Sequence, residues 1–204
     1  MPEQVFPTKS NLIHTKKSLT LARLGYDLMD QKRTILIREM LALIDQAEAV
    51  QRQIDGIYQE AYLALRRANI TLGTCEAFAE AVPVDEGLRL DARSVMGVEL
   101  PIVSLEEGSA KPYYGLFATN SQLDEAYLRF SKVKQLTAQL AELESSVYRL
   151  ASAIQKTQKR ANALQNVLIP QFEAQLKFIS EALEEKDREE FSRLKVIQKA
   201  QGGL

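Results

Sequence analysis

The chain has 204 residues, and its 26 basic residues nearly balance its 27 acidic ones, which leaves a formal net charge of -1. So small a net charge produces no overall field that would attract nucleic acid or an anionic membrane surface. The single cysteine excludes an internal disulfide and argues against a thiolate metal cluster. No apolar run approaches the ~20 residues of a membrane span, and residues 1–10 lack the apolar core of a signal peptide. We therefore expect a cytoplasmic protein with no direct membrane insertion.

Residues 1–72 are predicted to form one long helix of a coiled coil, because no proline interrupts residues 10–72. Apolar residues recur there at alternating steps of three and four, the spacing of a supercoiled helix with one buried seam. Its positions are Leu12, Thr15, Leu19, Ala22, Tyr26, Met29, Arg33, Leu36, Met40, Leu43, Ala47, Val50, Ile54, Ile57, Ala61, Ala64 and Ala68. At 1.5 Å per residue such a helix would be roughly 95 Å long. Thr15 and Arg33 break the apolar seam, and Arg33 is either a device that fixes the register or part of a charged surface.

Residues 73–118 have a different composition, with five of the nine glycines and three of the six prolines. Residues 88–105 mix Val, Ile and Leu with Gly97 and Pro101, and residues 106–109 read EEGS, a turn signal. Pro101 argues for an edge strand or an irregular extended segment. We expect a small knob with short strands and turns, in the form of a β-hairpin or an irregular segment.

Residues 119–204 return to the heptad pattern and are predicted to form the second long helix. Thr119, Asn120 or Ser121 is the expected cap at its start. The seam positions are Leu123, Ala126, Phe130, Val133, Leu136, Leu140, Leu143, Val147, Leu150, Ile154, Thr157, Ala161, Leu164 and Leu168. Pro170 would end an ordinary helix, but apolar residues continue the stripe beyond it, so we favour a continuous helix bent near Pro170 over a break. Together these elements predict an all-α dominated fold, a long antiparallel two-helix coiled-coil hairpin with a small knob between the helices.

No catalytic or cofactor-binding pattern emerges from the sequence. His14 stands alone and is interpreted as a surface residue, and Cys75 has no CxxC companion and is interpreted as a partly buried structural thiol. No glycine-rich phosphate-binding motif and no nucleophile–base arrangement occurs. The charged clusters at residues 9–17, 30–33 and 180–190 are either solvated helix faces or docking surfaces, and spacing alone leaves both open. We expect a non-catalytic chain without cofactor or metal.

Four blocks of sequence point to a known family. Residues 6–36 read FPTKSNLIHTKKSLTLARLGYDLMDQKRTIL, and residues 93–101 read RSVMGVELP. Residues 162–170 read NALQNVLIP, and residues 187–199 read DREEFSRLKVIQK. In content and order these blocks resemble the D subunit, the central stalk component of V-type and A-type rotary ATPases and ATP synthases.

The resemblance implies a rotor shaft that couples ATP hydrolysis or synthesis to the movement of protons or sodium ions through a membrane ring. The partners it implies are an A/B hexamer, the F subunit, and the C (or d) subunit above the ring, with the chain peripheral to the membrane in the soluble sector. The residues that would face the hexamer lie at the tip formed by the chain ends. They are Pro7, Thr8, Lys9, Lys16, Lys17, Arg188, Arg193 and Lys195. The residues that would form the foot and meet the F subunit are Arg93, Ser94, Val95, Met96, Gly97, Val98 and Pro101.

Two other interpretations stay open at this point. One is the helical-hairpin stalk component of a flagellar or type III secretion export ATPase, which would ordinarily lack the glycine- and proline-containing knob. The other is a scaffolding coiled coil, for which a parallel homodimer is expected rather than two helices of one chain packed together.

Overall fold

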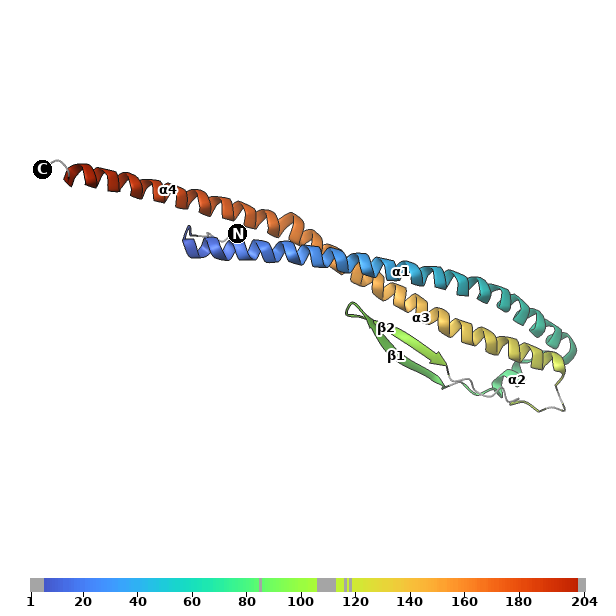
Figure 1. The fold of residues 1–204 in the computed structure, drawn as a ribbon. Helices are drawn as coiled ribbons and strands as arrows, with labels where there is room; N and C mark the ends of the chain where they lie inside the picture. The colour runs from blue at the N-terminus through green and yellow to red at the C-terminus, as the bar shows by residue number, and fades with distance from the viewer. Residues whose placement is uncertain (1–5, 85, 106–112, 116, 118, 202–204) are drawn as a thin grey trace. The chain divides into compact units, whose positions relative to one another are not determined.

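The computed structural model describes residues 6–84, 86–105, 113–115, 117 and 119–201, and it is mostly helical (Figure 1). Helix α1 spans Lys9–Leu72, and the second helical stretch consists of α3 (Ser121–Ala163), the π-helical turn η1 (Leu164–Leu168) and α4 (Ile169–Gln201). Between them lie the short helix α2 (Glu76–Glu80) and the strands β1 (Leu88–Val95) and β2 (Val98–Leu105). Two long helices packed together, with a two-stranded antiparallel hairpin between them, confirm the predicted fold class.

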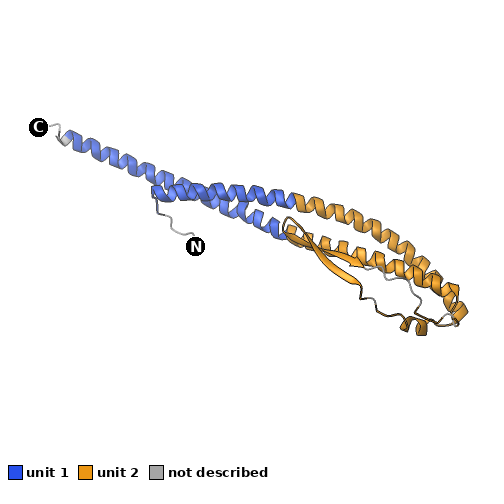
Figure 2. Ribbon diagram, turned by 60° about the horizontal axis from the view of Figure 1, so that its bottom comes forward, with its two compact units in different colours: residues 1–34, 155–204 blue, residues 35–154 orange. Residues whose placement is uncertain are grey.

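The chain divides into two units, coloured separately in Figure 2. Unit 1 comprises residues 1–34 and 155–204, and unit 2 comprises residues 35–154. In unit 1 the guanidinium of Arg23 lies 2.7 Å from the carboxylate of Glu173, and Arg33 donates to the side-chain oxygen of Gln158. Later residues of α1 thus meet earlier residues of the second stretch, so the helices of this unit are antiparallel.

Unit 2 shows the same antiparallel pairing. Arg129 of α3 forms ion pairs with Glu125 on its own helix and with Glu60 on α1. Near the end of α1 the Thr71 hydroxyl donates to the Gln122 side chain at 3.0 Å. These contacts tie the last turns of α1 to the first turns of α3.

The predicted seam of α1 is the face that the structure buries. Each of its seam positions from Leu12 to Ala68 is buried or half-buried. Leu36 and Leu43 of α1 pack with Leu150 of α3 in the main core cluster of unit 2, and fully burying a leucine side chain contributes about 1.5–3 kcal/mol. Toward the end of α1 the seam positions are small residues, Ala61, Ala64 and Ala68, all buried. Such small side chains let the two helix backbones approach closely.

The helix ends follow local capping chemistry. The Thr8 hydroxyl accepts a hydrogen bond from the Asn11 N–H at 3.2 Å, which makes Thr8 the N-cap of α1. Gly73, with a φ of 80°, follows Leu72 and donates to the Asn69 carbonyl, a left-handed C-terminal cap that suits glycine. The side-chain oxygen of Asn120 accepts from the Leu123 N–H at 3.1 Å, so Asn120 is the cap of α3 among the three residues expected.

The hairpin has a two-residue turn. Val95 pairs with Val98 across it, and the two central residues, Met96 and Gly97, have φ values of 51° and 76°. Positive φ at both positions is the signature of a type I′ turn, whose twist matches that of the flanking strands. The pairing then runs in register to Leu88 and Leu105. The EEGS segment expected to form a turn lies at residues 106–109, outside the described residues.

The second helical stretch does not stop at Pro170, which is the second residue of α4 and directly follows the π-helical turn η1. The continuity that we favoured is therefore present, while the bend near Pro170 stays a prediction. One seam assignment was wrong. Leu168 is 38% exposed and lies off the buried face, because η1 takes up one residue of the heptad just before it.

Candidate interaction surfaces

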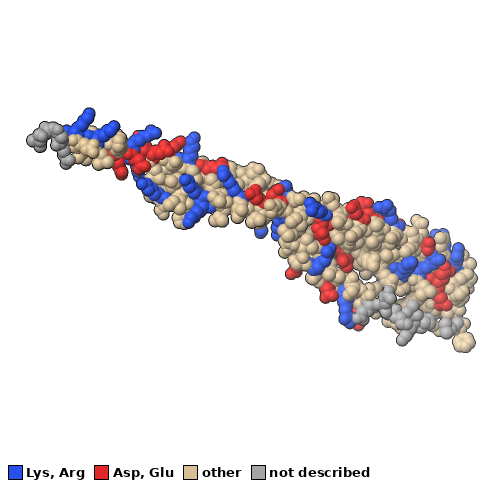
Figure 3. Space-filling model, viewed as in Figure 1, with Lys and Arg blue, Asp and Glu red and all other residues tan. Residues whose placement is uncertain are grey.

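The residues predicted to form a tip all lie in unit 1, and we call them the terminal surface. Figure 3 shows basic and acidic side chains interspersed along the helices rather than gathered in a patch of one sign. Lys16 and Lys17 are exposed near the start of α1. Thr8 has a structural role as the helix cap, which the family resemblance alone did not indicate.

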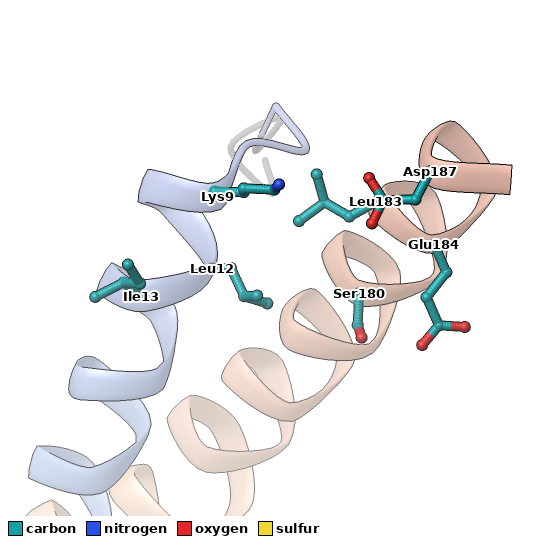
Figure 4. A pocket seen from close by; sticks show the side chains of 7 residues that line it. All are labelled: Lys9, Leu12, Ile13, Ser180, Leu183, Glu184 and Asp187. Atoms are coloured by element: carbon teal, nitrogen blue, oxygen red, sulfur yellow. The ribbon is translucent and has the colours of Figure 1, made fainter. Parts of the chain in front are cut away.

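A shallow groove of about 390 Å³ separates the first turns of α1 from α4. In Figure 4, Lys9 and Leu12 point from α1 toward α4, and Leu183 points back toward them. Glu184 and Asp187 complete the acidic side of the groove. The groove shows that the beginning of α1 lies level with residues 180–187 of α4.

The last turns of α4 carry apolar side chains that are largely exposed. Phe191, Leu194 and Ile197 are each more than half exposed. They recur at steps of three, so they occupy neighbouring positions along the helix. Our sequence reasoning named the charges of this segment and left out its apolar stripe as an interaction surface, although the spacing was visible.

The basic residues of this segment interact within α4 itself. Arg188 and Arg193 form ion pairs with Glu185 and Glu189, both at 3.8 Å. The Lys195 ammonium lies 4.8 Å from the centre of the Phe191 ring. Exposed pairs of this kind contribute about 0.2–1 kcal/mol each, so they shape the helix surface more than they stabilise the fold.

The second candidate surface is the hairpin surface, formed by residues 93–98 and Pro101. Some of its residues pack inward against the helices, and others are exposed. Val95 and Val98 pack on the main core cluster of unit 2, and the Arg93 guanidinium pairs with Glu39 of α1 at 3.2 Å. Ser94 is exposed, and Met96 is 44% exposed at the turn. The structure thus gives several of these residues a role in holding the hairpin on the helices.

The outer edge of β2 is covered by side chains of α3. Glu142 accepts a hydrogen bond from the Val103 N–H at 2.8 Å, and Arg149 donates to the Glu99 carbonyl at 3.1 Å. Pro101 lies between these two positions and has no N–H to satisfy. An unpaired strand edge is a liability, and here Glu142, Arg149 and Pro101 protect part of it. Sequence reasoning expected Pro101 on an edge strand or in an irregular extended segment, and it missed Glu142 and Arg149, whose partners are backbone atoms.

A small second core forms where α1 ends and α3 begins. Tyr114 packs there with Ala68 and Leu123, and the half-buried Cys75 lies against this cluster. The Tyr114 hydroxyl donates to the Asp124 carboxylate at 2.7 Å. Burial, followed by the hydrogen bond to Asp124, raises the pKa of Tyr114 well above its usual range. Cys75 itself is partly buried against this cluster, in line with the interpretation from the sequence.

Within the described residues, no group of three or more His, Cys, Asp or Glu side chains is placed to hold a metal ion. His14 is exposed on α1. The helices described here also include none that is long and apolar enough to cross a membrane.

Comparison with known proteins identifies the family. The model of the family described as the D subunit of ATP synthase matches residues 11–199. The chain belongs to the V/A-type ATP synthase D-subunit family. A V-type ATP synthase D subunit of Thermotoga neapolitana is 42% identical over 94% of this chain and 95% of its own length. An A-type ATP synthase D subunit of Pyrococcus furiosus is 36% identical over 97% of this chain and 95% of its own length.

Membership of this family makes the chain a component of an ATP synthase complex, as the resemblance had predicted. The matched region includes both candidate surfaces, except the first residues of the terminal surface, Pro7, Thr8 and Lys9. It also spans η1 and Pro170, so the π-helical turn lies within the part of the chain that matches the family rather than in an added tail.

Proposed function

We propose that this chain is the central rotor shaft of a V/A-type ATP synthase. It is not itself catalytic; it couples ATP hydrolysis or synthesis in an A/B hexamer to proton or sodium translocation through the membrane ring. The observation that carries the proposal is the buried heptad seam, which continues along a helix of 64 residues, in a chain that belongs to the D-subunit family. A helix pair stiffened by a continuous seam transmits torque, which an irregular connector does not.

The terminal surface supports contact with the hexamer. Beyond the groove, residues 188–201 of α4 carry exposed apolar side chains and short-range ion pairs. A contiguous exposed apolar patch marks a partner interface, and Phe191, Leu194 and Ile197 lie at neighbouring positions on one helix. We assign the hexamer contact to this segment together with Lys9, Lys16 and Lys17.

The hairpin surface supports a second contact, to the F subunit. Met96 holds a left-handed backbone conformation, which costs a residue with a Cβ roughly 1–2 kcal/mol. The type I′ turn accounts for this conformation, and it leaves the Met96 side chain 44% exposed at the end of the hairpin, where a partner can reach it. The F subunit then docks on the turn and the adjacent helix surface, and the F-bound shaft stands on the C (or d) subunit above the ring.

The export-ATPase stalk and the scaffolding coiled coil have less support. Two helices of one chain pair in both units, whereas the scaffold interpretation expects a parallel homodimer. The family match covers the hairpin that an export stalk would ordinarily lack.

Single-molecule rotation tests the proposal directly. The complex is reconstituted from A, B and F subunits with this chain, the hexamer is immobilised, and a bead is attached through a Val84→Cys substitution at an exposed site in the Cys75→Ser background. We expect stepwise, one-directional rotation of the bead that requires ATP. ATP hydrolysis with a stationary bead would show that the chain is a static component.

A further inference from the structure

The buried positions of unit 1 contain a break in phase of one residue. Up to Leu164 the buried face follows the heptad, through Thr157 and Ala161. It resumes at Phe172 and continues through Leu176, Ile179 and Leu183. Phe172 follows Leu164 by eight residues (172 minus 164), whereas one step of four and one step of three in a heptad make seven. One residue is in excess between two regular runs.

The excess residue lies where the backbone changes form. The turn from Leu164 to Leu168 is π-helical, and the N–H of Ile169 bonds to the carbonyl of Leu164, five residues earlier. A π-helical turn closes its hydrogen bonds over one residue more than an α-helical turn. The turn therefore absorbs the eighth residue and returns the following helix to the phase of the preceding one.

The exposed fractions of side chains in and after the turn show which face of the helix is buried. An uninterrupted α-helical heptad from Leu164 would place Leu168 and Phe178 on the seam. Both are outside it, with 38% and 57% of their surface exposed, whereas Ile179 is fully buried. The rotation that separates Phe178 from Ile179 is about 100°, the angle per residue of an α-helix.

Pro170 explains why the excess residue sits at this place. A proline inside an α-helix lacks the N–H and collides with the carbonyl four residues earlier, which here belongs to Asn166 in the middle of η1. The wider turn relieves that collision. Across from the turn, a Cβ built on Gly25 would be 3.8 Å from the nearest atom of Leu164, so α1 passes close to this point.

Contacts with α1 fix the orientation of the second helical stretch both before and after η1. Before the turn, Arg33 of α1 donates to Gln158, which in turn donates to Asn162. After it, Arg23 of α1 pairs with Glu173. The helix is thus tied to α1 on each side of η1.

We infer that residues 164–168 and Pro170 form a phase-setting device. The turn stores one surplus residue, and Pro170 fixes its position, so that α4 presents Ile179 to α1 and keeps Phe178 outside. A surplus residue free to move along the helix would rotate every residue that it passes by about 100° and exchange these two side chains. The inference concerns the isolated chain and does not depend on the rotor proposal.

Thiol labelling of single cysteines measures the phase. In the Cys75→Ser background, cysteine replaces Phe178 or Ile179 in two separate proteins, and maleimide labelling is timed for the full chain. Cysteine at position 179 should label roughly tenfold or more slowly than cysteine at position 178, because a buried thiol reacts only through local opening.

Two variants that change the number of residues in the helix then test whether the π-helical turn takes up the surplus residue. Deleting Asn166 together with Pro170→Ala removes the surplus and the proline, so the helix becomes regular and position 179 stays protected. Inserting one alanine after Gln171 adds a residue beyond the turn, so protection passes from position 179 to position 178. Loss of protection at 179 in the deletion, or its retention in the insertion, would overturn the inference.

Pro170→Ala alone tests the fixing role. Without the proline the turn can move, so labelling at 179 should speed up several-fold while helix content by circular dichroism stays the same. A labelling rate identical to that of the parent would remove Pro170 from the device. Gln171→Ala, an exposed neighbour that alters neither length nor proline, is the matched control and should leave both rates unchanged.

Discussion

Tyr114 shows how a single side chain anchors the segment before α3. It is buried between α1 and α3, donates to Asp124, and meets the rings of Phe78 and Tyr127 edge-on at 6.5 and 6.1 Å. Sequence reasoning passed over this residue because nothing in its local pattern distinguishes it from the exposed Tyr113. Its environment, rather than its identity, makes its phenol hard to ionise.

This shift makes unit 2 sensitive to alkaline pH. Because the folded pKa of Tyr114 is raised, the unfolded chain releases the phenolic proton first. The stabilising contribution is complete below the unfolded pKa near ~10 and is lost as the pH rises beyond it toward the folded pKa. Tyr114→Phe should lower stability by about 0.5–1.5 kcal/mol near neutral pH, through the lost hydrogen bond, and flatten the decline above pH ~10.

Urea unfolding followed between neutral and alkaline pH checks this expectation. Tyr148→Phe is the matched control, because Tyr148 is exposed on α3. It should change neither the stability nor its slope with pH. Equal alkaline slopes in Tyr114→Phe and the parent would contradict the role of Tyr114.

At the scale of elements, contacts with α3 stabilise the hairpin more than the pairing of its two strands does. A two-stranded hairpin alone is marginal in water. Here Leu100 is fully buried against the helix pair, and the edge of β2 is bonded to Glu142 and Arg149. Its stability is therefore tertiary, although its turn is local.

We predict that Glu142→Ala loosens the hairpin without unfolding the helices. The Val103 N–H would lose its acceptor, which costs about 1–3 kcal/mol when the group stays buried and less when water reaches it. Hydrogen exchange should accelerate in β2 and stay unchanged at the buried seam of α1. Glu142→Gln keeps an acceptor oxygen and should recover most of the protection.

The exposed Glu144 on the same helix provides the control for charge. Glu144→Ala removes the same kind of carboxylate two residues away and should leave β2 protection as in the parent. If Glu142→Ala and Glu144→Ala exchange alike, the bond to Val103 has no part in holding the strand.

At the scale of the whole molecule, we expect the heptad seam and the exposed end of α4 to have different functions. The seam holds the helices together, and residues 188–201 lie beyond the groove where α1 begins. Removing them deletes no seam position that the structure buries. Folding and assembly should therefore separate experimentally.

We predict that ending the chain after Asp187 leaves the remaining helices folded, while it weakens binding to the A/B hexamer or reduces torque. The expected signs are an unchanged melting temperature, ATP hydrolysis that persists, and slower ATP-driven ion pumping in the reconstituted complex. Full pumping with unchanged assembly affinity would mark this segment as a solvated tail.

Two full-length variants identify which side chains carry the effect. One replaces Phe191, Leu194 and Ile197 with glutamine, and the other replaces Arg188, Arg193 and Lys195 with glutamine. If apolar contact dominates, the first reproduces the truncation and the second changes mainly the salt dependence of assembly. The reverse pattern would assign the contact to charge.

Much of the fold was decided by local rules that act along the chain. Heptad spacing predicted both helices and the seam of α1, because a 3.5-residue repeat requires a partner on one face wherever it occurs. The glycines and prolines of residues 73–118 predicted where the long helices end and turns and strands begin. Family motifs, including RSVMGVELP, predicted the family to which the chain belongs.

Tertiary structure decided what depends on atoms far apart in sequence. Glu142 and Arg149 bond to the backbone of β2, and backbone atoms leave no trace in a sequence. The pKa of Tyr114 is raised by burial, which only the packed helices create. Leu168 satisfied the heptad but lies outside the seam, because the π-helical turn takes up one residue and rotates the helix past it. Sequence periodicity records which residues are apolar, and the backbone decides which of them face inward.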